Sequence, residues 1–352
     1  LTHITPEIMP PVLAIAERDE VSGQDLLLAL AIGTEVETRL GASLDYPAFR
    51  SRGWHGPGVI GPFGAAAAVG HLLGLKPDRM AAAFGLAGSQ AAGTFAAWGT
   101  PTVKFHQCRG ALSGLMAALL AHEGFVATQQ FLTAPDGGLY STYTSGGHPA
   151  LAVEALGDRW ELEQIALRLW PSGSSIQGMI TAMFDLVEKH SLKAENVSRV
   201  RVFLDKPIAD MHGMFPHYKA KFEALLSAHY IAAAILHDQE LTLDQFEPQR
   251  YDDPQLRRFA AERVEVLADP RLSGVQSRVE AETTDGRLLS ALCLIPKGSP
   301  ENPLSRAQIE GKFRRYARNV LSSEKIEAAV DVMAHLEDLQ STRTLMDVLR
   351  AE

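Results

Sequence analysis

The stretch RGWHGPGVIGPFGAAAAVGHLLGL at residues 52–75, followed by AAAFGLAGSQAAGTFAAWGT at residues 81–100, carries the strongest fold signal of the chain. Helices built from so many alanines and glycines have almost no polar face, which a surface helix needs. We therefore expect two closely packed helices at the centre of a helical domain. Trp54 and His55 precede them in a Gly/Pro-rich turn, and loops on a rigid scaffold often carry catalytic residues.

Composition describes an ordinary globular protein and excludes several classes of partner. Of the 352 residues, 46% are hydrophobic and 21% are charged, which suits a soluble chain with a large core. The net charge of −9, with scattered lysines and arginines, argues against nucleic acid or a membrane surface as partner. The apolar runs 59–75 and 81–98 contain Pro62, His71 and Gln90, so we interpret them as core helices and not as membrane spans.

The two cysteines, Cys108 and Cys293, are far apart and show no zinc-type spacing. We interpret both as small buried residues of a protein in a reducing, cytoplasmic compartment. No spacing of potential ligands indicates a metal site. The chain starts at Leu1 on a segment that resembles the interior of a domain, so we expect further residues to precede it.

Periodicity divides the chain into a helical part and an α+β part. Residues 8–41 read as two helices, with Ser22 as an N-cap before an acidic first turn. Residues 136–147 are rich in glycine and predict a loop. The run 197–204 alternates apolar and polar residues like a half-buried strand, and residues 277–295 read as a hairpin around an Asp-Gly turn.

The predicted fold class is therefore mainly α, with a smaller α+β domain inserted before the C-terminal helices. A helix is expected over residues 222–238, and helices return after residue 305. We expect a helical domain formed by residues 1–163 and 302–352, and an α+β lid domain formed by residues 164–301.

Five blocks of the chain, in order, resemble the MmgE/PrpD family, which includes 2-methylcitrate dehydratase, cis-aconitate decarboxylase and iminodisuccinate epimerase. The blocks lie at residues 53–75, 85–93, 105–125, 223–234 and 285–315. The resemblance implies a homodimer that closes a lid over a small di- or tricarboxylic acid. It also implies proton abstraction next to a carboxylate without an organic cofactor.

The chain departs from the family pattern at two motifs. Val103 stands where the family usually has a lysine, with Lys104 beside it. In the lid motif RLWPSGSSIQ, Arg168 replaces a lysine and Gln177 replaces a histidine. Because these changes remove groups that the dehydratase and decarboxylase pattern contains, they favour an epimerase.

Several residues are candidates for the site. An imidazole transfers protons near neutral pH, so His55 and His3 are candidate acids or bases. His3 occupies the position of a family histidine. Lys104 is a candidate base, and it would share a face with His106 if the segment after Pro101 were extended. The resemblance adds Tyr230, whose phenol would stabilise an anion.

The remaining candidates would bind substrate. The guanidinium of Arg168 offers a planar fork for a carboxylate, and His106, Trp54 and Gln177 complete the predicted binding set. Each of these side chains also has an ordinary structural interpretation, such as packing in a core or lying in solvent.

We expect an epimerase or isomerase that acts on an iminodisuccinate-like acid. The first alternative is a lyase of the 2-methylcitrate dehydratase or cis-aconitate decarboxylase type. The second alternative is a catalytically silent homologue that binds a ligand or serves as a structural dimer.

Overall fold

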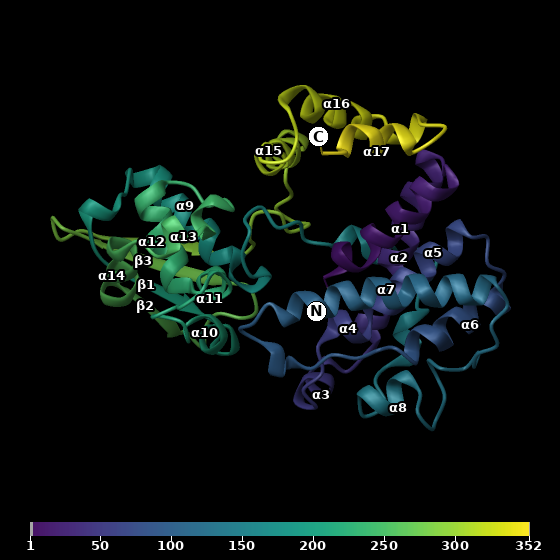
Figure 1. Cartoon of the computed structure of the whole chain (residues 1–352). Helices are drawn as coiled ribbons and strands as arrows, with labels where there is room; N and C mark the ends of the chain where they lie inside the picture. The colour runs from purple at the N-terminus through teal and green to yellow at the C-terminus, as the bar shows by residue number, and fades with distance from the viewer. Residues whose placement is uncertain (1–2, 352) are drawn as a thin grey trace. The chain divides into compact units, whose positions relative to one another are not determined.

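The computed structural model describes residues 3–351 and divides the chain into two compact units (Figure 1). Unit 1 contains residues 1–164 and 317–352, and unit 2 contains residues 165–316. Unit 1 is helical, whereas unit 2 combines helices with one sheet. The expected fold class, mainly α with a smaller α+β part inserted before the last helices, is confirmed. The expected α+β part ended at residue 301, while the structure groups residues 302–316 with unit 2 as well.

Helices of unit 1 surround a short apolar helix, α5. The helices before the crossover are α1 (Ile4–Asp19), α2 (Gly23–Ser43), α3 (Tyr46–Ser51), α4 (Gly56–Val59), α5 (Gly61–Leu72), α6 (Pro77–Gly88), α7 (Thr102–His122) and α8 (Leu139–Tyr143). Short 3-10 helices lie at Phe95–Ala97, Pro149–Ala152 and Glu161–Gln164. Helices α1, α2, α6 and α7 all contact α5.

Small residues allow these helices to approach α5 closely. A Cβ atom at Gly114 of α7 would lie 2.4 Å from the Cβ of Ala65, and one at Gly33 of α2 would lie 2.8 Å from the Cβ of Ala68. Any larger side chain at either glycine would push the helices apart. Residues 61–70 of α5 are all buried, as expected for a helix without a polar face.

The last helices of the chain pack against the first ones. Helix α16 (Ser323–Ala334), the 3-10 helix Leu336–Asp338 and α17 (Arg343–Leu349) add side chains to the apolar cluster of α1 and α2. Two backbone hydrogen bonds fix this return: Gly23 N–H donates to the carbonyl of Leu339 over 2.9 Å, and Thr342 N–H donates to that of Val21 over 2.8 Å.

A buried ion pair on α2 anchors the segment that leaves unit 1. The Arg39 guanidinium pairs with Glu35, and the two side chains are 3% and 7% exposed. Arg39 also donates to the carbonyls of Glu154 (2.8 Å) and Arg159 (2.6 Å), while Glu35 accepts from Leu162 N–H (3.2 Å). Since the pair is almost fully desolvated, these additional hydrogen bonds are what make its burial tolerable.

Unit 2 is a two-layer α+β arrangement. Its helices are α9 (Gln177–His190), α10 (Lys206–His212), α11 (Lys221–Leu226), α12 (Ala228–Asp238), α13 (Pro248–Tyr251), α14 (Pro254–Arg263) and α15 (Arg306–Ala317). Its strands are β1 (Val197–Leu204), β2 (Val264–Ala268), β3 (Ser277–Thr283) and β4 (Leu288–Cys293). Short 3-10 helices lie at Ser174–Ile176, Ala194–Asn196 and Asp244–Phe246.

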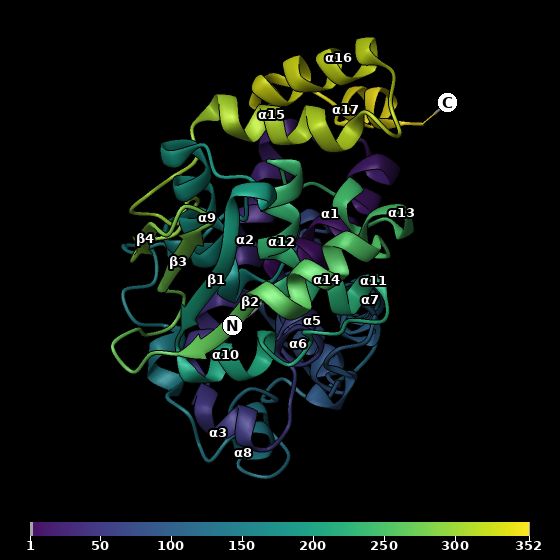
Figure 2. The same ribbon diagram turned by 90° about the vertical axis from the view of Figure 1, so that its left-hand side faces the viewer.

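The four strands lie side by side in the order β2-β1-β3-β4 (Figure 2). Strand β1 pairs with β2 in parallel and with β3 antiparallel, and β3 pairs with β4 antiparallel. Helix α9 contacts β3 and β4, α12 contacts β2, and the two helices contact each other. Side chains that do not face these helices form exposed or half-exposed ion pairs, such as Arg199–Glu265 and Arg201–Glu280.

The structure corrects several local expectations. Residues 81–98 do not form one helix, because α6 ends at Gly88 and a turn with a short 3-10 helix follows. The expected helix 222–238 is divided at Ser227, whose hydroxyl caps α12 by accepting from Tyr230 N–H (3.1 Å). The predicted loop at residues 136–147 contains the short helix α8. Cys293 is buried as expected, but Cys108 is exposed.

Two glutamates are fully buried beside α5. Glu7 of α1 and Glu37 of α2 are both 0% exposed. Their stems fill space left by glycines: a Cβ at Gly61 would lie 2.5 Å from Glu7 Cγ, and one at Gly64 would lie 2.8 Å from Glu37 Oε2. Burial, and then the charge of Glu7, raise the pKa of Glu37 well above its ordinary value. Folding therefore favours the neutral, protonated form of Glu37 over its charged form.

Replacing Glu37 by glutamine should stabilise the protein at alkaline pH. As pH rises above the ordinary glutamate pKa of 4.5, the unfolded chain releases a proton that the folded chain keeps, so stability falls. For one group this slope is about 1.4 kcal/mol per pH unit until the folded pKa is reached. Urea unfolding between pH 5 and 8 should show a flatter profile for Glu37→Gln. The exposed Glu123→Gln is the control and should keep the wild-type slope.

Candidate active site

Two loops of unit 1 pair with each other and fix the position of His55. The His55 N–H donates to the carbonyl of Gly93 (3.1 Å), and Ala92 N–H donates to that of Gly58 (3.0 Å). An isolated antiparallel bridge joins Trp54 to Thr94. These bonds hold the Gly/Pro-rich turn before α4 against the segment that follows α6. Backbone hydrogen bonds therefore fix the position of the turn, although it has little regular structure of its own.

His55 and His106 form a buried pair. Their Nδ1 atoms are 2.9 Å apart, and the residues are only 7% and 9% exposed. His106 lies in the first turns of α7, so the pair joins this helix to the turn before α4. Gly93 makes the pair possible, because its φ is +129° and a Cβ there would lie 3.1 Å from Cγ and Nδ1 of His106. A Cβ at residue 93 would press on the imidazole, which would have to move by a few tenths of an ångström.

Both rings are uncharged near neutral pH. Burial, followed by the neighbouring imidazole of His106 and the charges of Arg50 and Lys104, lowers the pKa of His55 to about 4. Burial also lowers the pKa of His106. The cations that act on His55 create a positive field at the pair, which favours a bound anion. The acidic net charge of the chain does not exclude such a local field.

Arg50 is a site residue that the sequence analysis missed. Its guanidinium lies 3.5 Å from the centre of the Phe95 ring, and it donates to the carbonyl of Trp54 (3.2 Å). Phe95 in turn contacts the His55 ring edge-on, with 5.8 Å between the ring centres, and stacks on Trp98. The only feature of the sequence that could have pointed to Arg50 is its place as a basic residue in the last turn of α3, five positions before His55.

A neutral pair joined through Nδ1 atoms has a defined proton arrangement. One Nδ1 carries the shared proton and donates it, while the other Nδ1 accepts. It follows that one ring has an unprotonated Nε2, which accepts hydrogen bonds, and the other has an Nε2–H, which donates. The two roles are exchanged when the shared proton is transferred while one ring loses its Nε2 proton and the other gains one at Nε2. The pair therefore offers a base and an acid at the same time, as proton transfer at carbon requires.

The other predicted residues of unit 1 lie in different settings. Lys104 is exposed and sits on α7, so it does not share an extended face with His106, but its charge acts on His55. The segment after Pro101 is helical and not extended, because α7 begins at Thr102. Trp54 is half-buried and packs edge-on against Tyr143, with 5.0 Å between ring centres. His3 lies at the N-cap of α1, four positions before Glu7.

Three predicted residues belong to unit 2. Tyr230 is 0% exposed, and its hydroxyl donates to the carbonyl of Gln245, so this phenol stabilises the core of unit 2. Gln177 is 4% exposed and bonds the backbone of Trp170 and Gly173. Arg168 donates to the carbonyl of Ser172 over 3.1 Å. The bonds of Arg168 and Gln177 stabilise the backbone of the lid motif. The roles of Arg168, Gln177 and Tyr230 toward a substrate stay predictions.

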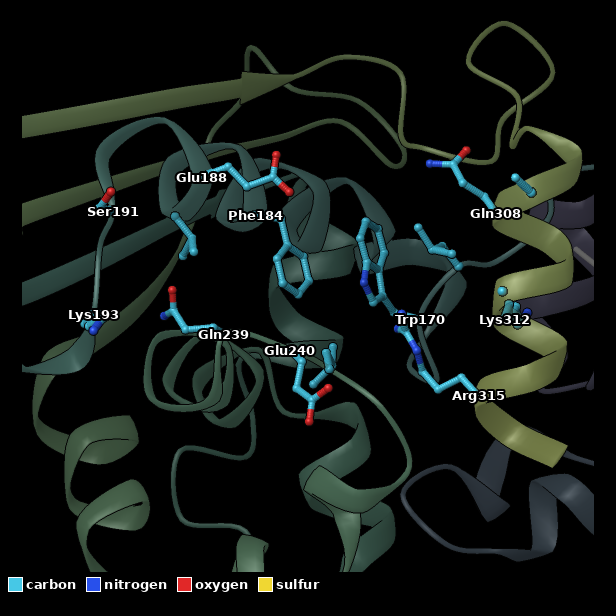
Figure 3. Close-up of a pocket in the computed structure, with 15 residues that line it drawn as sticks. Trp170, Phe184, Glu188, Ser191, Lys193, Gln239, Glu240, Gln308, Lys312 and Arg315 are labelled. Atoms are coloured by element: carbon cyan, nitrogen blue, oxygen red, sulfur yellow. The ribbon is translucent and has the colours of Figure 1, made fainter. Parts of the chain in front are cut away.

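Unit 2 also contains a cavity of about 760 Å³ between the ends of α9 and α12 and helix α15 (Figure 3). The stacked rings of Trp170 and Phe184 line it, with 5.2 Å between their centres. Its charges are mixed, because Glu188 and Glu240 accompany the cations of the wall: Lys193, Lys312 and Arg315. It contains no histidine, so the proton chemistry available at His55 and His106 is absent there.

Two further observations concern residues 3–351. Within this range no three His, Cys, Asp or Glu side chains are grouped to hold a metal ion. None of the helices that the structure describes is both long and apolar enough to cross a membrane. The homodimer and the cytoplasmic location stay predictions.

Comparison with known proteins assigns the family. Residues 1–152 match the MmgE/PrpD N-terminal domain, and residues 170–338 match the MmgE/PrpD C-terminal domain. The chain belongs to the MmgE/PrpD family. It is therefore an enzyme of a family that contains both isomerases and lyases.

Curated relatives of this MmgE/PrpD chain carry decarboxylase names. A cis-aconitate decarboxylase-like protein, oryM, of Aspergillus oryzae is 29% identical over 99% of the chain and 77% of its own length. The human cis-aconitate decarboxylase is 27% identical over 99% of the chain and 74% of its own length. That of Aspergillus terreus is 28% identical over 99% and 76%. These names favour the lyase alternative, and the epimerase expectation is not confirmed.

Substitution of Gly93 tests the histidine pair of this MmgE/PrpD enzyme. Gly93→Ala should shift the His106 ring, weaken the Nδ1–Nδ1 contact and, because alanine is strained at this positive φ, destabilise the protein by about 1–3 kcal/mol. NMR of the imidazole resonances and thermal unfolding report the two effects. Gly137→Ala is the matched control, since Gly137 also has a positive φ (+75°) but nothing lies within 4 Å of its Cβ position. Unchanged histidine resonances in Gly93→Ala would contradict the described contact.

Proposed function

We propose that this enzyme is a lyase of the cis-aconitate decarboxylase type, acting on a small unsaturated tricarboxylic acid. The observation that carries the proposal is the buried, neutral His55–His106 pair in the positive field of Arg50 and Lys104. A polyanion is attracted by that field, and a group that delivers a proton to carbon lies within it. The names of the relatives support the same class of substrate.

The chemistry needs one bond to break and one proton to arrive. The bond between a carbon and its carboxylate breaks, CO2 leaves, and the electron pair stays on the carbon. Conjugation through the double bond delocalises this pair into a remaining carboxylate, where Arg50 and Lys104 stabilise the negative charge. The carbon then takes a proton from the Nε2–H of the histidine pair. No organic cofactor takes part in these steps.

The pair restores its own protonation. The ring that gives its Nε2 proton to the carbon takes the shared proton at Nδ1, so it stays neutral. The other ring takes a proton at its Nε2 from solvent in the same step, so it does not become an imidazolate. The two histidines thus exchange tautomers in each turnover, and neither has to become an imidazolium. This matters because the same buried surroundings that lower the pKa of His55 make its charged form costly.

Incubation with cis-aconitate in deuterated buffer tests the proposal. The expected result is release of CO2 together with one deuterium on carbon in the product, followed by NMR. His55→Gln and His106→Gln should each lower kcat by about 100-fold or more, because they remove the proton donor. His148→Gln, outside the pair, is the control. In a parallel incubation with a dicarboxylic acid, deuterium exchange without loss of CO2 would instead select the epimerase. If neither the dicarboxylic acid nor cis-aconitate reacts, the catalytically silent homologue is selected.

Arg50 should control both substrate binding and the titration of His55. In Arg50→Met the carboxylates lose a cation, so KM should rise by about 10-fold or more, the effect of roughly 1.4 kcal/mol. Because Arg50 lowers the pKa of His55, this pKa should be higher in Arg50→Met than the wild-type value of about 4. In the wild type, binding of a tricarboxylate should also raise the pKa of His55, because the bound anion stabilises the charged imidazole. An NMR titration of the imidazoles measures both shifts. Arg52→Met is the control, since Arg52 bonds Thr142 and Ser145 instead.

A further inference from the structure

A serine in the lid motif of unit 2 is hydrogen-bonded to a fully buried histidine that the proposed reaction does not use. Ser175 Oγ lies 2.7 Å from Nε2 of His212, and Nδ1 of His212 lies 2.7 Å from the carbonyl oxygen of Leu226. His212 is 0% exposed, whereas Ser175 is partly exposed. The three groups form a chain that leads from the surface of unit 2 to a fixed backbone acceptor.

The carbonyl determines the state of the imidazole. A carbonyl oxygen only accepts hydrogen bonds, so Nδ1 of His212 must carry the proton and donate it to Leu226. In the neutral ring Nε2 is then unprotonated and accepts from the Ser175 hydroxyl. Burial lowers the pKa of His212 to about 4, so the ring is uncharged near neutral pH and this arrangement persists. The hydroxyl proton of Ser175 therefore points at a base.

Two neighbouring features favour reaction at Ser175. Gly173 leaves room for the imidazole, because a Cβ at that position would lie 2.8 Å from Cε1 of His212. Ser175 also lies one residue before the N-cap of α9, a helix of 14 residues whose N-cap residue, Ile176, makes no side-chain capping bond. The positive end of this helix is suited to a developing negative charge close to Ser175.

We propose that Ser175 is a nucleophile that His212 activates, and that unit 2 thereby holds a second reactive site that accepts acyl groups from small activated esters or thioesters. Leu226 orients the imidazole through its carbonyl, in the place that a carboxylate takes in a catalytic triad. Because the geometry lies within unit 2, this inference is independent of the function proposed for His55 and His106.

The acyl transfer balances without any further reagent. Oγ of Ser175 forms a bond to the acyl carbon while its proton moves to Nε2 of His212. The bond from the acyl carbon to the leaving oxygen or sulfur then breaks, and the leaving group takes the proton from Nε2. The products are the Ser175 ester, a free alcohol or thiol, and a neutral imidazole with its Nδ1 proton still on the carbonyl of Leu226. Water attacking the ester by the same route returns the free serine.

Acetylation by p-nitrophenyl acetate tests the site in the full chain. The expected result is a burst of p-nitrophenolate and one acetyl group per chain, located at Ser175 by peptide mapping. Ser175→Ala should abolish the acetylation, and Ser174→Ala is the control from the same turn. His212→Gln keeps a side-chain amide near the Nε2 position but removes the base, so the acetylation rate should fall by about 100-fold. Acetylation at another residue, or a wild-type rate in His212→Gln, would overturn the proposal.

A second variant keeps the test decisive if His212→Gln fails to fold. Ser175→Cys places a thiol beside the imidazole, and an activated thiol reacts with iodoacetamide faster than an ordinary one. The exposed Cys108 of the same chain is an internal reference. Alkylation at position 175 at least 10-fold faster than at Cys108 supports activation by His212. An equal or slower rate means that the serine and the histidine form only a structural hydrogen bond.

Discussion

Close approach of α7 and α2 to α5 is the constraint on which unit 1 depends. Gly114 and Gly33 remove the side chains that would separate these helices from the alanines of α5. Packing at this distance gains many small dispersion contacts and excludes water from the helix surfaces. It also sets where the first turns of α7 lie relative to the Gly/Pro-rich turn. The contact between His106 and His55 is therefore a result of helix packing as much as of the loop that carries His55.

The sequence predicted the parts of the fold that have a simple period or a capping residue. The alternation at residues 197–204 identified β1, Ser22 identified the start of α2, and the absence of a polar face identified α5 as buried. The Asp-Gly pair located the turn between β3 and β4, where Gly286 has a φ of +85°. Strand β2 escaped notice, because it is short and pairs in parallel with β1 across a long separation in the chain.

The candidate site was predicted only in part, for physical reasons that a single sequence does not contain. His55 and His106 were both singled out, but their contact depends on the positive φ of Gly93 and on the bridge between two loops. Arg50 was missed because its effect on His55 acts through Phe95 and through electrostatics in space. Tyr230 illustrates the opposite case, a residue that was singled out but is used in the core of unit 2. A phenol can donate a hydrogen bond to an anion, but here its hydroxyl donates to a backbone carbonyl inside that core.

The close approach of Gly64 to α2 leaves no single change that makes room for a larger residue. A Cβ at residue 64 would lie 2.8 Å from the Cβ and Oε2 of Glu37 and 2.9 Å from the carbonyl oxygen of Gly33. Shortening residue 37 removes its carboxylate but leaves its Cβ and the backbone of Gly33 in place, so α5 and α2 would still have to move apart. Related sequences should therefore keep glycine at residue 64 even where residue 37 is not glutamate.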